Sequence, residues 1–289
     1  MNLITKKQVS LPKRGVKSRK GDNGKALVIG GSRDYVGALA LAGMAALRSG
    51  ADWVTIAAPE KAGYVINALS PDLVVKKYKG DDFCAARAKD ILKLENDFDS
   101  VLIGNGIGMD SASFVKKYVK GTKKQLVIDA DAIKSISLDM ADNAILTPHA
   151  GELKILLQNS KIDKTLVEKI INKQSSITDR ASLIQKILSD KRLRDKKIVL
   201  LLKGPVDAII SRDAIMYNKT GNAGMTKAGT GDVLAGLCVG FLAQGLSLMQ
   251  SAVNAAYFNG LAGDILLKRK KGFTYLASDL VGEIRRLCG

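Results

Sequence analysis

An alternation of short apolar runs with longer helix-like segments is the feature that most constrains the fold of this chain. Runs rich in β-branched residues predict buried strands at Ala26–Ile29, Trp53–Ala57, Val101–Ile103, Leu126–Ile128 and Ile198–Leu202. Between them, helical length and spacing predict helices at Ala38–Arg48, Ala62–Leu69, Phe83–Leu94 and Ser111–Val119. Such alternation predicts an α/β fold, with a central, mostly parallel sheet and helices on both faces.

The second half of the chain departs from this alternation. Gly151–Asp190 is mostly helical in pattern, and two short runs, Ala208–Ile210 and Ala214–Tyr217, predict a hairpin. The C-terminal third predicts helices at Val233–Ala243, Met249–Leu267 and Tyr275–Leu287. No linker, repeat or low-complexity tract interrupts it. We therefore expect one domain over residues 21–289, preceded by a basic segment over residues 1–20.

The formal net charge of +17 bears on the class of ligand. Seven Lys or Arg and no acidic residue lie within the first twenty positions, and further clusters occur at Lys191–Lys197 and Lys268–Lys271. Phosphate contacts with nucleic acid are one explanation. However, the clusters are scattered and only 5% of residues are aromatic, so platforms for base stacking are scarce. The pattern instead favours solvated helix ends and electrostatic steering of a small polyanion.

Other sequence features narrow the environment of the protein. No apolar run reaches the roughly 18–20 residues that span a bilayer, and the N-terminus lacks the apolar core of a signal peptide. Three widely spaced cysteines without a CxxC argue against a disulfide framework or a zinc site. His149 is the single histidine, which excludes a His-rich metal site. These features predict a cytoplasmic protein without a membrane partner.

Unusual residues gather where the predicted strands end. Because ligands of open parallel sheets bind beyond the carboxyl ends of the strands, this placement predicts a ligand site. The segments concerned are Gly30–Ser32 with Tyr35–Ala38, Gly104–Gly108, Asp129–Asp131, Thr147–His149 and Lys203-Gly204. Gly104–Gly108 is a weak match to a dinucleotide-binding fingerprint and a better match to a loop that lets a ligand approach the backbone.

Several of these polar residues have two interpretations. Asp129 and Asp131 can form a turn and a helix cap or take part in a site. A lone histidine is usually a satisfied structural residue, but the position of His149 at a strand end favours ligand contact. Lys203 follows five apolar residues, so a phosphate or carboxylate partner is expected. Glu152 either caps the following helix or helps to hold a hydrated metal ion.

Gly221–Gly236 carries the clearest chemical signal. Its glycines precede a predicted helix, so unpaired backbone N–H groups and the positive end of the helix dipole would form an anion pocket. Asp232 places a carboxylate beside that pocket, where it either stabilises the helix start or takes a proton from a hydroxyl that meets a phosphate. Phosphoryl transfer needs an anion cradle, a divalent metal and a base that accepts the proton of the attacking hydroxyl. The chain has no GxxxxGK[ST], so the pattern predicts phosphoryl transfer without a Walker-type site.

These motifs together resemble a known family. Gly229–Asp232 followed by Val233–Gly236 is similar to the signature of ribokinase-like enzymes. Together with Lys25–Ser32, Gly104–Gly108, Asp129–Asp131, Thr147–Glu152 and Lys203-Gly204, it resembles the NAD(P)H-hydrate dehydratase family, in order from about residue 20 to the C-terminus. The resemblance implies a lyase that restores NADH or NADPH from the S form of its hydrate. ADP or ATP phosphorylates the C6 hydroxyl of the hydrated ring, and phosphate is then eliminated.

The resemblance also implies roles for individual residues. Asp232 would be the base and would contact the substrate, and Gly229, Thr230 and Gly231 would form the anion hole. Ala38, Gly106 and His149 would contact the hydrated dinucleotide, and Mg²⁺ would bridge phosphates near Glu152 through water. The residues implied at the nucleotide site are Lys203, Gly204, Pro205, Val206, Asp207, Asn222, Gly224, Met225 and Gly231.

The resemblance has departures and alternatives. Lys227-Ala228 stands where a Thr-Gly pair is common, which could alter nucleotide contacts. An N-terminal epimerase domain, frequent in this family, does not fit in this chain, so we expect a separate epimerase or spontaneous interconversion. Single-domain prokaryotic members favour ADP, and a homotetramer is expected. The alternatives are a ribokinase-like kinase of a vitamin precursor such as hydroxyethylthiazole, and a non-catalytic protein that binds nucleotide or nucleic acid.

Overall fold

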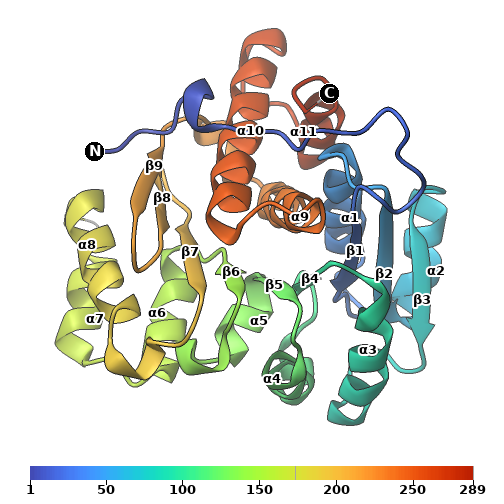
Figure 1. Ribbon diagram of the computed structural model, residues 1–289, viewed down its shortest axis with the longest axis horizontal. Coiled ribbons are helices and arrows are strands. Elements are labelled where there is room, and N and C mark those ends of the chain that lie inside the picture. Colours follow the sequence, from blue (N-terminus) through green and yellow to red (C-terminus); the bar gives the residue numbers. More distant parts are fainter. Residues whose placement is uncertain (173, 289) are drawn as a thin grey trace.

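A nine-stranded, mostly parallel sheet forms the centre of the computed structural model, which describes residues 1–172 and 174–288 (Figure 1). The strand order is β3-β2-β1-β4-β5-β6-β7-β8-β9. The first seven strands run parallel, and β7, β8 and β9 pair antiparallel, which confirms the expected hairpin. The strands are β1 Lys25–Ile29, β2 Trp53–Pro59, β3 Val74–Tyr78, β4 Ser100–Ile103, β5 Gln125–Ile128, β6 Ala144–Leu146, β7 Ile198–Leu202, β8 Asp207–Ile210 and β9 Ile215–Asn218.

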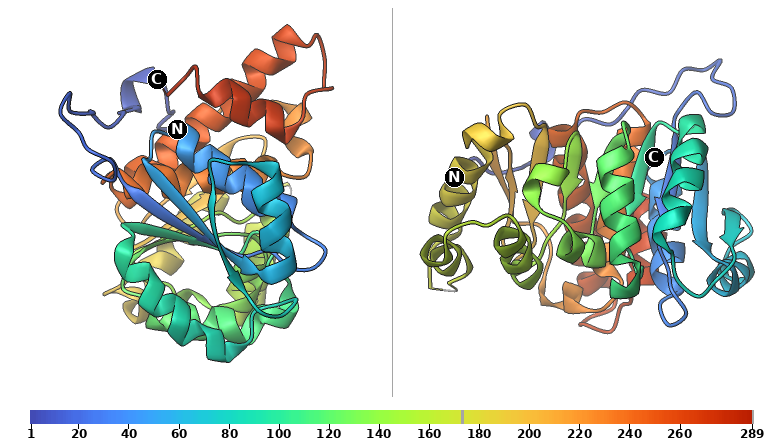
Figure 2. Two further views of the ribbon diagram at one scale, coloured as in Figure 1. Left: turned by 90° about the vertical axis from the view of Figure 1, so that its right-hand side faces the viewer. Right: turned by 90° about the horizontal axis from the view of Figure 1, so that it is seen from below.

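Helices cover both faces of the sheet, as the alternation predicted (Figures 1 and 2). One face carries α1 Gly37–Arg48, α2 Glu60–Leu69, α9 Thr230–Ala243, α10 Leu248–Arg269 and α11 Ala277–Ile284. The opposite face carries α3 Ala88–Leu94, α4 Ala112–Gly121, α5 Ala130–Ser135, α6 Ala150–Asn159, α7 Lys164–Ile171 and α8 Ile177–Leu188. Successive residues of a strand point to opposite faces, so Leu27 and Val28 of β1 belong to different hydrophobic clusters.

The structure differs from the sequence prediction at several element ends and at two elements. β3 was not predicted because it lies at the sheet edge, where Lys76 and Lys77 are only partly covered and no apolar run is needed. The short helix α5 was also missed. The helix expected from Phe83 begins at Ala88, after a single turn of 3₁₀-helix, and the last helix is confined to Ala277–Ile284.

The basic N-terminal segment packs along the outer side of α10 and reaches β9 (Figure 1). The backbone around Leu3 forms a parallel bridge with Tyr217 of β9. The side chain of Asn254 on α10 donates to the Ser10 carbonyl oxygen at 2.8 Å and accepts from the Ser10 N–H at 3.3 Å. Of the helices in the described part of the chain, none is both long and apolar enough to cross a bilayer.

The strand order reverses between β1 and β4. The chain builds β1, β2 and β3 toward one edge and then returns, so that β4 pairs with the other side of β1. The loops after β1 and β4 therefore diverge at their carboxyl ends, which is where open α/β sheets bind ligands. The glycine-rich loops of the sequence, Gly30–Ser32 and Gly104–Gly108, follow these two strands.

Candidate active site

Asp232 lies in the first turn of α9 at the carboxyl edge of the sheet. It is the third residue of the helix, after the N-cap Gly229. Its Oδ1 accepts a hydrogen bond of 2.6 Å from Nδ2 of Asn105, which lies in the loop after β4. This contact joins the N-terminus of α9 to the point where the strand order reverses.

Asn105 connects Asp232 to a second carboxylate. The same Nδ2 donates to Oδ2 of Asp129 at 2.9 Å. Asp129 follows β5, and its Oδ1 accepts from Oγ1 of Thr147 at 2.6 Å and from Nζ of Lys203 at 3.1 Å. Although Asp129 occupies the N-cap position of α5, its side chain makes no capping bond. The backbone of Asp129 forms the expected turn, since its carbonyl accepts from Ala132 N–H at 3.2 Å, while its carboxylate bonds Asn105, Thr147 and Lys203.

Lys203 and Glu152 extend this network to α6. Nζ of Lys203 lies 3.7 Å from Oε2 of Glu152, and the Glu152 side chain is nearly buried. The sequence predicts a phosphate or carboxylate partner for Lys203, and in the structure this partner is a pair of carboxylates, Asp129 and Glu152. The Lys203 ammonium also lies 3.5 Å from the position that a Cβ at Gly231 would occupy, so it faces the first turn of α9. A phosphate at that turn would meet a positive charge.

The electrostatics of the site favour proton transfer at Asp232. Burial raises the pKa of Asp232 to about 6, and the nearby carboxylates of Asp129 and Glu152 act in the same direction, against the Asn105 hydrogen bond and Lys203. Burial disfavours the charged ammonium of Lys203, but Asp129 and Glu152 outweigh it and hold the pKa of Lys203 above its usual value. A carboxylate with a pKa near 6 is mostly ionised at neutral pH and still able to accept a proton.

The turn before α9 presents free backbone donors. Gly229 is the N-cap residue at which the chain turns into α9. It adopts a left-handed conformation with φ of +94°, which favours glycine. Thr230 N–H makes a long 3.4 Å bond to Lys227, and Oγ1 of Thr230 donates to the Met225 carbonyl at 2.7 Å. Among the described residues, the N–H groups of Gly229, Gly231 and Asp232 have no acceptor. Free N–H groups at the positive end of the α9 dipole can bind an anion. We therefore call Gly229–Asp232 the anion-binding turn.

Ala38 and Gly106 lie close together at the reversal of strand order. Gly106 has φ of +65°, and a Cβ there would meet Tyr35 at 2.7 Å and the Ala38 methyl at 3.5 Å. The backbone of the Asn105 loop therefore approaches the start of α1, which brings the two predicted substrate contacts, Ala38 and Gly106, together.

His149 is the N-cap residue of α6. Its Nδ1 accepts from Gly151 N–H at 3.0 Å and its backbone N–H donates to Oε2 of Glu152 at 2.9 Å, which forms a capping box. The His149 side chain is 57% exposed, with Nε2 at 3.4 Å from Oε1 of Glu152. The structural interpretation therefore holds for both residues, which cap α6. A ligand contact at His149 and a hydrated metal ion near Glu152 stay predictions.

The residues after β7 line a cavity of about 190 Å³. Asp207 does not face it: its carboxylate accepts from Gly204 N–H at 3.0 Å and from Nδ2 of Asn218 at 3.1 Å, which fixes the turn between β7 and β8. Burial raises the pKa of Asp207 to about 6. The lining residues are Ser175, Ile177, Arg180, Leu202, Lys203, Gly204, Pro205 and Val206. Arg180, which sequence reasoning did not select, adds a second cation to this wall.

Asn222, Gly224 and Met225 form a separate turn held by α10 and by the segment before α11. Asn222 donates to Oδ1 of Asp264 at 3.1 Å and accepts from the Tyr275 hydroxyl at 2.6 Å. Gly224 N–H donates to Oδ1 of Asn222 at 3.0 Å, and Met225 N–H to the Asn222 carbonyl at 3.0 Å. The Thr230 hydroxyl joins this turn to the anion-binding turn through Met225.

Lys227 points away from the anion-binding turn. Its Nζ donates to the backbone carbonyls of Phe273 and Tyr275, the latter at 2.7 Å, and lies 5.5 Å from the Tyr275 ring centroid. Lys227 thus ties the segment before α9 to the segment before α11. Its unusual position in the motif has a structural explanation.

The described residues hold no group of three or more His, Cys, Asp or Glu side chains arranged to ligate a metal. Glu152 already accepts from His149 and faces Lys203. A divalent cation here would take few protein oxygens and would depend on phosphate oxygens and water, the usual preference of Mg²⁺.

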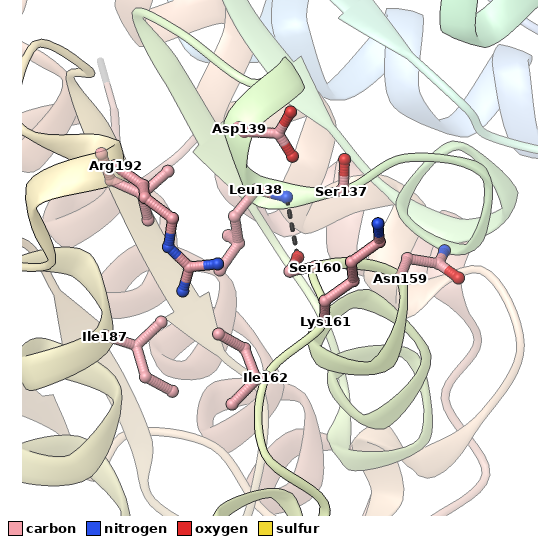
Figure 3. Close-up of a pocket in the computed structure, with 10 residues that line it drawn as sticks. Ser137, Leu138, Asp139, Asn159, Ser160, Lys161, Ile162, Ile187 and Arg192 are labelled. Carbon is pink, nitrogen blue, oxygen red and sulfur yellow. Dashed lines mark hydrogen bonds between the residues drawn. The ribbon is translucent and has the colours of Figure 1, made fainter.

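A second cavity, of about 370 Å³, lies away from this site (Figure 3). Its residues follow α6 or precede β6 and β7, which places it at the amino ends of these strands, whereas Asp232 lies at the carboxyl edge. Leu138 N–H donates to the Ser160 hydroxyl at 2.8 Å within it, and Arg192 and Ile162 line the wall. No residue predicted for the active site contributes to this cavity.

Comparisons with known proteins show the family of this chain. A family model described as NAD(P)H-hydrate dehydratase matches residues 26–286. The chain is 39% identical over 284 residues to the bifunctional NAD(P)H-hydrate repair enzyme Nnr of Methanothermobacter thermautotrophicus. This match covers 95% of this chain and 51% of that protein. It is 35% identical over 260 residues to the ADP-dependent (S)-NAD(P)H-hydrate dehydratase of Cenarchaeum symbiosum, covering 88% of this chain and 85% of that protein. The chain spans about half the length of several of its curated relatives.

Solved structures agree with the family model and with the curated relatives. The ADP/ATP-dependent NAD(P)H-hydrate dehydratase of Bacillus subtilis, co-crystallized with ATP and Mg²⁺, has a TM-score of 0.78 and 27% identity, and the match covers 97% of this chain and 94% of that one. A ribokinase-like protein shares the fold as well, which confirms the expected fold class. The family match over most of the chain shows that this protein belongs to the NAD(P)H-hydrate dehydratase family.

Proposed function

We propose that this protein dehydrates the S form of hydrated NADH or NADPH, with ADP as co-substrate, and so restores the reduced cofactor. The observation that carries the proposal is the position of Asp232, whose carboxylate lies beside the free N–H groups of the turn at Gly229–Gly231. A base and an anion cradle at one point suit transfer of a phosphoryl group to a hydroxyl. The relative from Cenarchaeum symbiosum carries the name of this ADP-dependent activity.

In the first step, Asp232 accepts the proton of the C6 hydroxyl while the hydroxyl oxygen attacks the terminal phosphorus of ADP. The bond between that phosphorus and its bridging oxygen breaks, and AMP leaves. In the second step, the ring C–O bond breaks and phosphate departs with its electron pair. The neighbouring ring carbon loses a proton to the departing phosphate, and the electrons of that C–H bond restore the ring double bond. Asp232 suits the first step because its raised pKa leaves it ionised near neutral pH yet basic.

The free N–H groups of Gly229 and Gly231 stabilise the negative charge of the phosphoryl group during transfer. Lys203, which faces Gly231, adds a positive charge, and Asp129 and Glu152 hold that ammonium in place. We assign the nucleotide to the side of Lys203 formed by Gly204, Pro205 and Val206, whose turn Asp207 fixes, and by Asn222, Gly224 and Met225. The absence of carboxylates from the wall of the 190 Å³ cavity, within the described residues, supports this assignment.

The hydrated ring is assigned to the opposite side, against Ala38, Gly106 and the exposed ring of His149. When bound, Mg²⁺ would neutralise phosphate charge, and Glu152 is the residue we assign to it, through water. The family resemblance further supports a homotetramer. The bifunctional naming of the longer relatives supports an epimerase that supplies the S form from the other hydrate.

The decisive experiment incubates the folded protein with the S form of hydrated NADH, Mg²⁺ and either ADP or ATP. Return of reduced-nicotinamide absorbance, with AMP formed from ADP, is the expected result. A parallel reaction with hydroxyethylthiazole as acceptor tests the kinase alternative and should give no phosphorylated product. Lack of recovery with both nucleotides, from protein shown to be folded, would remove the proposal.

A further inference from the structure

We propose that Asn105 is a positioning residue that aims the Asp232 carboxylate and keeps it ionised in a buried site shared with Asp129. The inference rests on the proposed role of Asp232 as the base. It concerns a side chain that no sequence signal selected, and it starts from an unusual arrangement: one amide nitrogen donates to two carboxylates.

The geometry uses the full donor capacity of the Asn105 amide. Nδ2 carries two hydrogens, and it lies 2.6 Å from Oδ1 of Asp232 and 2.9 Å from Oδ2 of Asp129. The opposite amide orientation would place Oδ1 against both carboxylates, where only repulsion is available. The two carboxylates therefore fix the orientation of the amide, and the amide fixes the distance between them.

This arrangement leaves a polar atom without a partner. Asn105 is fully buried, and its Oδ1 has no hydrogen-bond partner among the described residues. An unpaired buried acceptor costs stability, so a purely structural explanation of Asn105 is poor. The loop is held independently, because the Asn105 carbonyl accepts from Gly31 N–H at 2.9 Å. The hydrogen bonds of the Asn105 side chain, within the described residues, therefore all go to the two carboxylates.

The charges that face Asp232 come from three other elements. Asp129 after β5 and Glu152 on α6 raise the proton affinity of Asp232, and Lys203 after β7 lowers it. The hydrogen bond from Asn105 also lowers the pKa and opposes the largest influence, which is burial. Without that bond, Asp232 would be protonated over more of the neutral pH range and would be a poorer base.

The test measures the protonation of Asp232 directly in the full chain without ligand. Aspartate carboxyl carbons are labelled with ¹³C, the Asp232 resonance is assigned by comparison with Asp232→Asn, and its shift is followed against pH. We expect a midpoint near pH 6, and a rise of about one pH unit or more in Asn105→Ala. Asn105→Asp, which keeps the side-chain size and removes both donors, should raise the midpoint at least as far.

Asn254→Ala is the matched control. Asn254 is also fully buried and also bonds through its side chain, but to Ser10 at the far side of α10. It should lower thermal stability without moving the midpoint of Asp232. Unchanged midpoints in folded Asn105→Ala and Asn105→Asp would overturn the inference.

Kinetics supply a second readout. The acid limb of kcat/KM should move to higher pH in Asn105→Ala while KM for ADP stays within about twofold. An equal loss of kcat at every pH, with the limb unmoved, would indicate a structural role and contradict the inference. If the protein lacks dehydratase activity altogether, the NMR titration still decides the claim about Asn105.

Discussion

Asp232 meets two opposing demands at the scale of a single residue. In its proposed role as the base it must be ionised, yet it lies in a partly buried position where Asp129 and Glu152 raise its pKa. The free N–H groups of the α9 turn and the ammonium of Lys203 make this charge tolerable. Burial disfavours the ionised form of the Asp232 carboxylate and so raises its pKa. The ionised carboxylate is therefore a stronger base, but it lowers the stability of the fold.

Replacing Asp232 by Asn should therefore abolish turnover without abolishing binding. We expect kcat to fall by roughly 10³-fold, because a general base is lost, while the Kd for ADP changes by less than about threefold. Single-turnover kinetics and calorimetric titration of ADP measure the two effects. Asp213→Asn, at a side chain that is 82% exposed, is the control and should behave as wild type. Unchanged turnover in Asp232→Asn would refute the assignment of the base.

The same substitution should stabilise the fold at high pH. The folded-state pKa of Asp232 is raised to about 6, above its usual 3.8, so the folded state binds this proton more tightly than the unfolded state. As pH rises through these two values, the wild type loses stability, and Asp232→Asn does not. We expect the variant to gain up to about 2 kcal/mol in the free energy of unfolding at pH 8, and almost none near pH 4. Denaturant titrations at both pH values measure the difference; an equal gain at both would exclude ionisation as its cause.

At the scale of elements, the packing of α9 on α1 determines where the site lies. Gly236 faces the backbone of Ala42, and Gly240 faces Ala46 and Ser49, so the two helices approach without intervening side chains. Almost every residue of α9 after Asp232 is buried. This close contact holds the N-terminus of α9, and Asp232 with it, against the loop that carries Asn105.

A comparison of Gly240→Ala with Gly282→Ala separates the effect of helix packing on stability from the effect of helix propensity. A Cβ at Gly240 would lie 2.7 Å from the Ala46 carbonyl oxygen, whereas one at Gly282 on α11 would meet open space. We expect Gly240→Ala to destabilise the protein by about 2 kcal/mol. Gly282→Ala should instead stabilise it by up to about 1 kcal/mol, because alanine is the better helix former. Thermal unfolding measures both, and equal changes in stability would contradict the packing argument.

At the scale of the whole molecule, the net charge of +17 acts on ligands that carry several negative charges. Seven of its basic residues lie within positions 1–20. Arg14 pairs with Asp52 and Lys20 lies over the Trp53 ring at the amino end of β2, whereas Asp232 lies at the carboxyl edge of the sheet. Charges at this distance do not form specific contacts in the site. We expect them to act through long-range attraction, which raises the local concentration of an anionic nucleotide.

Salt should therefore reduce the encounter rate and leave the chemical step unchanged. Between about 20 mM and 500 mM KCl, kcat/KM for ADP should fall by roughly tenfold, while kcat stays nearly constant. Steady-state kinetics at constant pH measure both parameters. A kcat/KM that does not respond to salt would show that the charge has no part in nucleotide capture.

The sequence by itself determined the layers of the fold and the family to which the chain belongs. Apolar runs such as Ile198–Leu202 specify buried strands through local pattern, and Gly229–Asp232 specifies a glycine-led helix start with a carboxylate in its first turn. The edge strand β3 escaped prediction because an exposed strand needs no apolar pattern.

Only the tertiary structure decided which residues meet. Asn105 bonds Asp129, 24 positions away, and Asp232, 127 positions away, through a strand order that no local pattern encodes. The partner of Lys203 became known in the same way, because Asp129 and Glu152 reach it from separate strand ends. Local sequence sets the conformation of each segment, but the contacts across the sheet edge depend on how the segments pack, and those contacts set the proton affinity of Asp232.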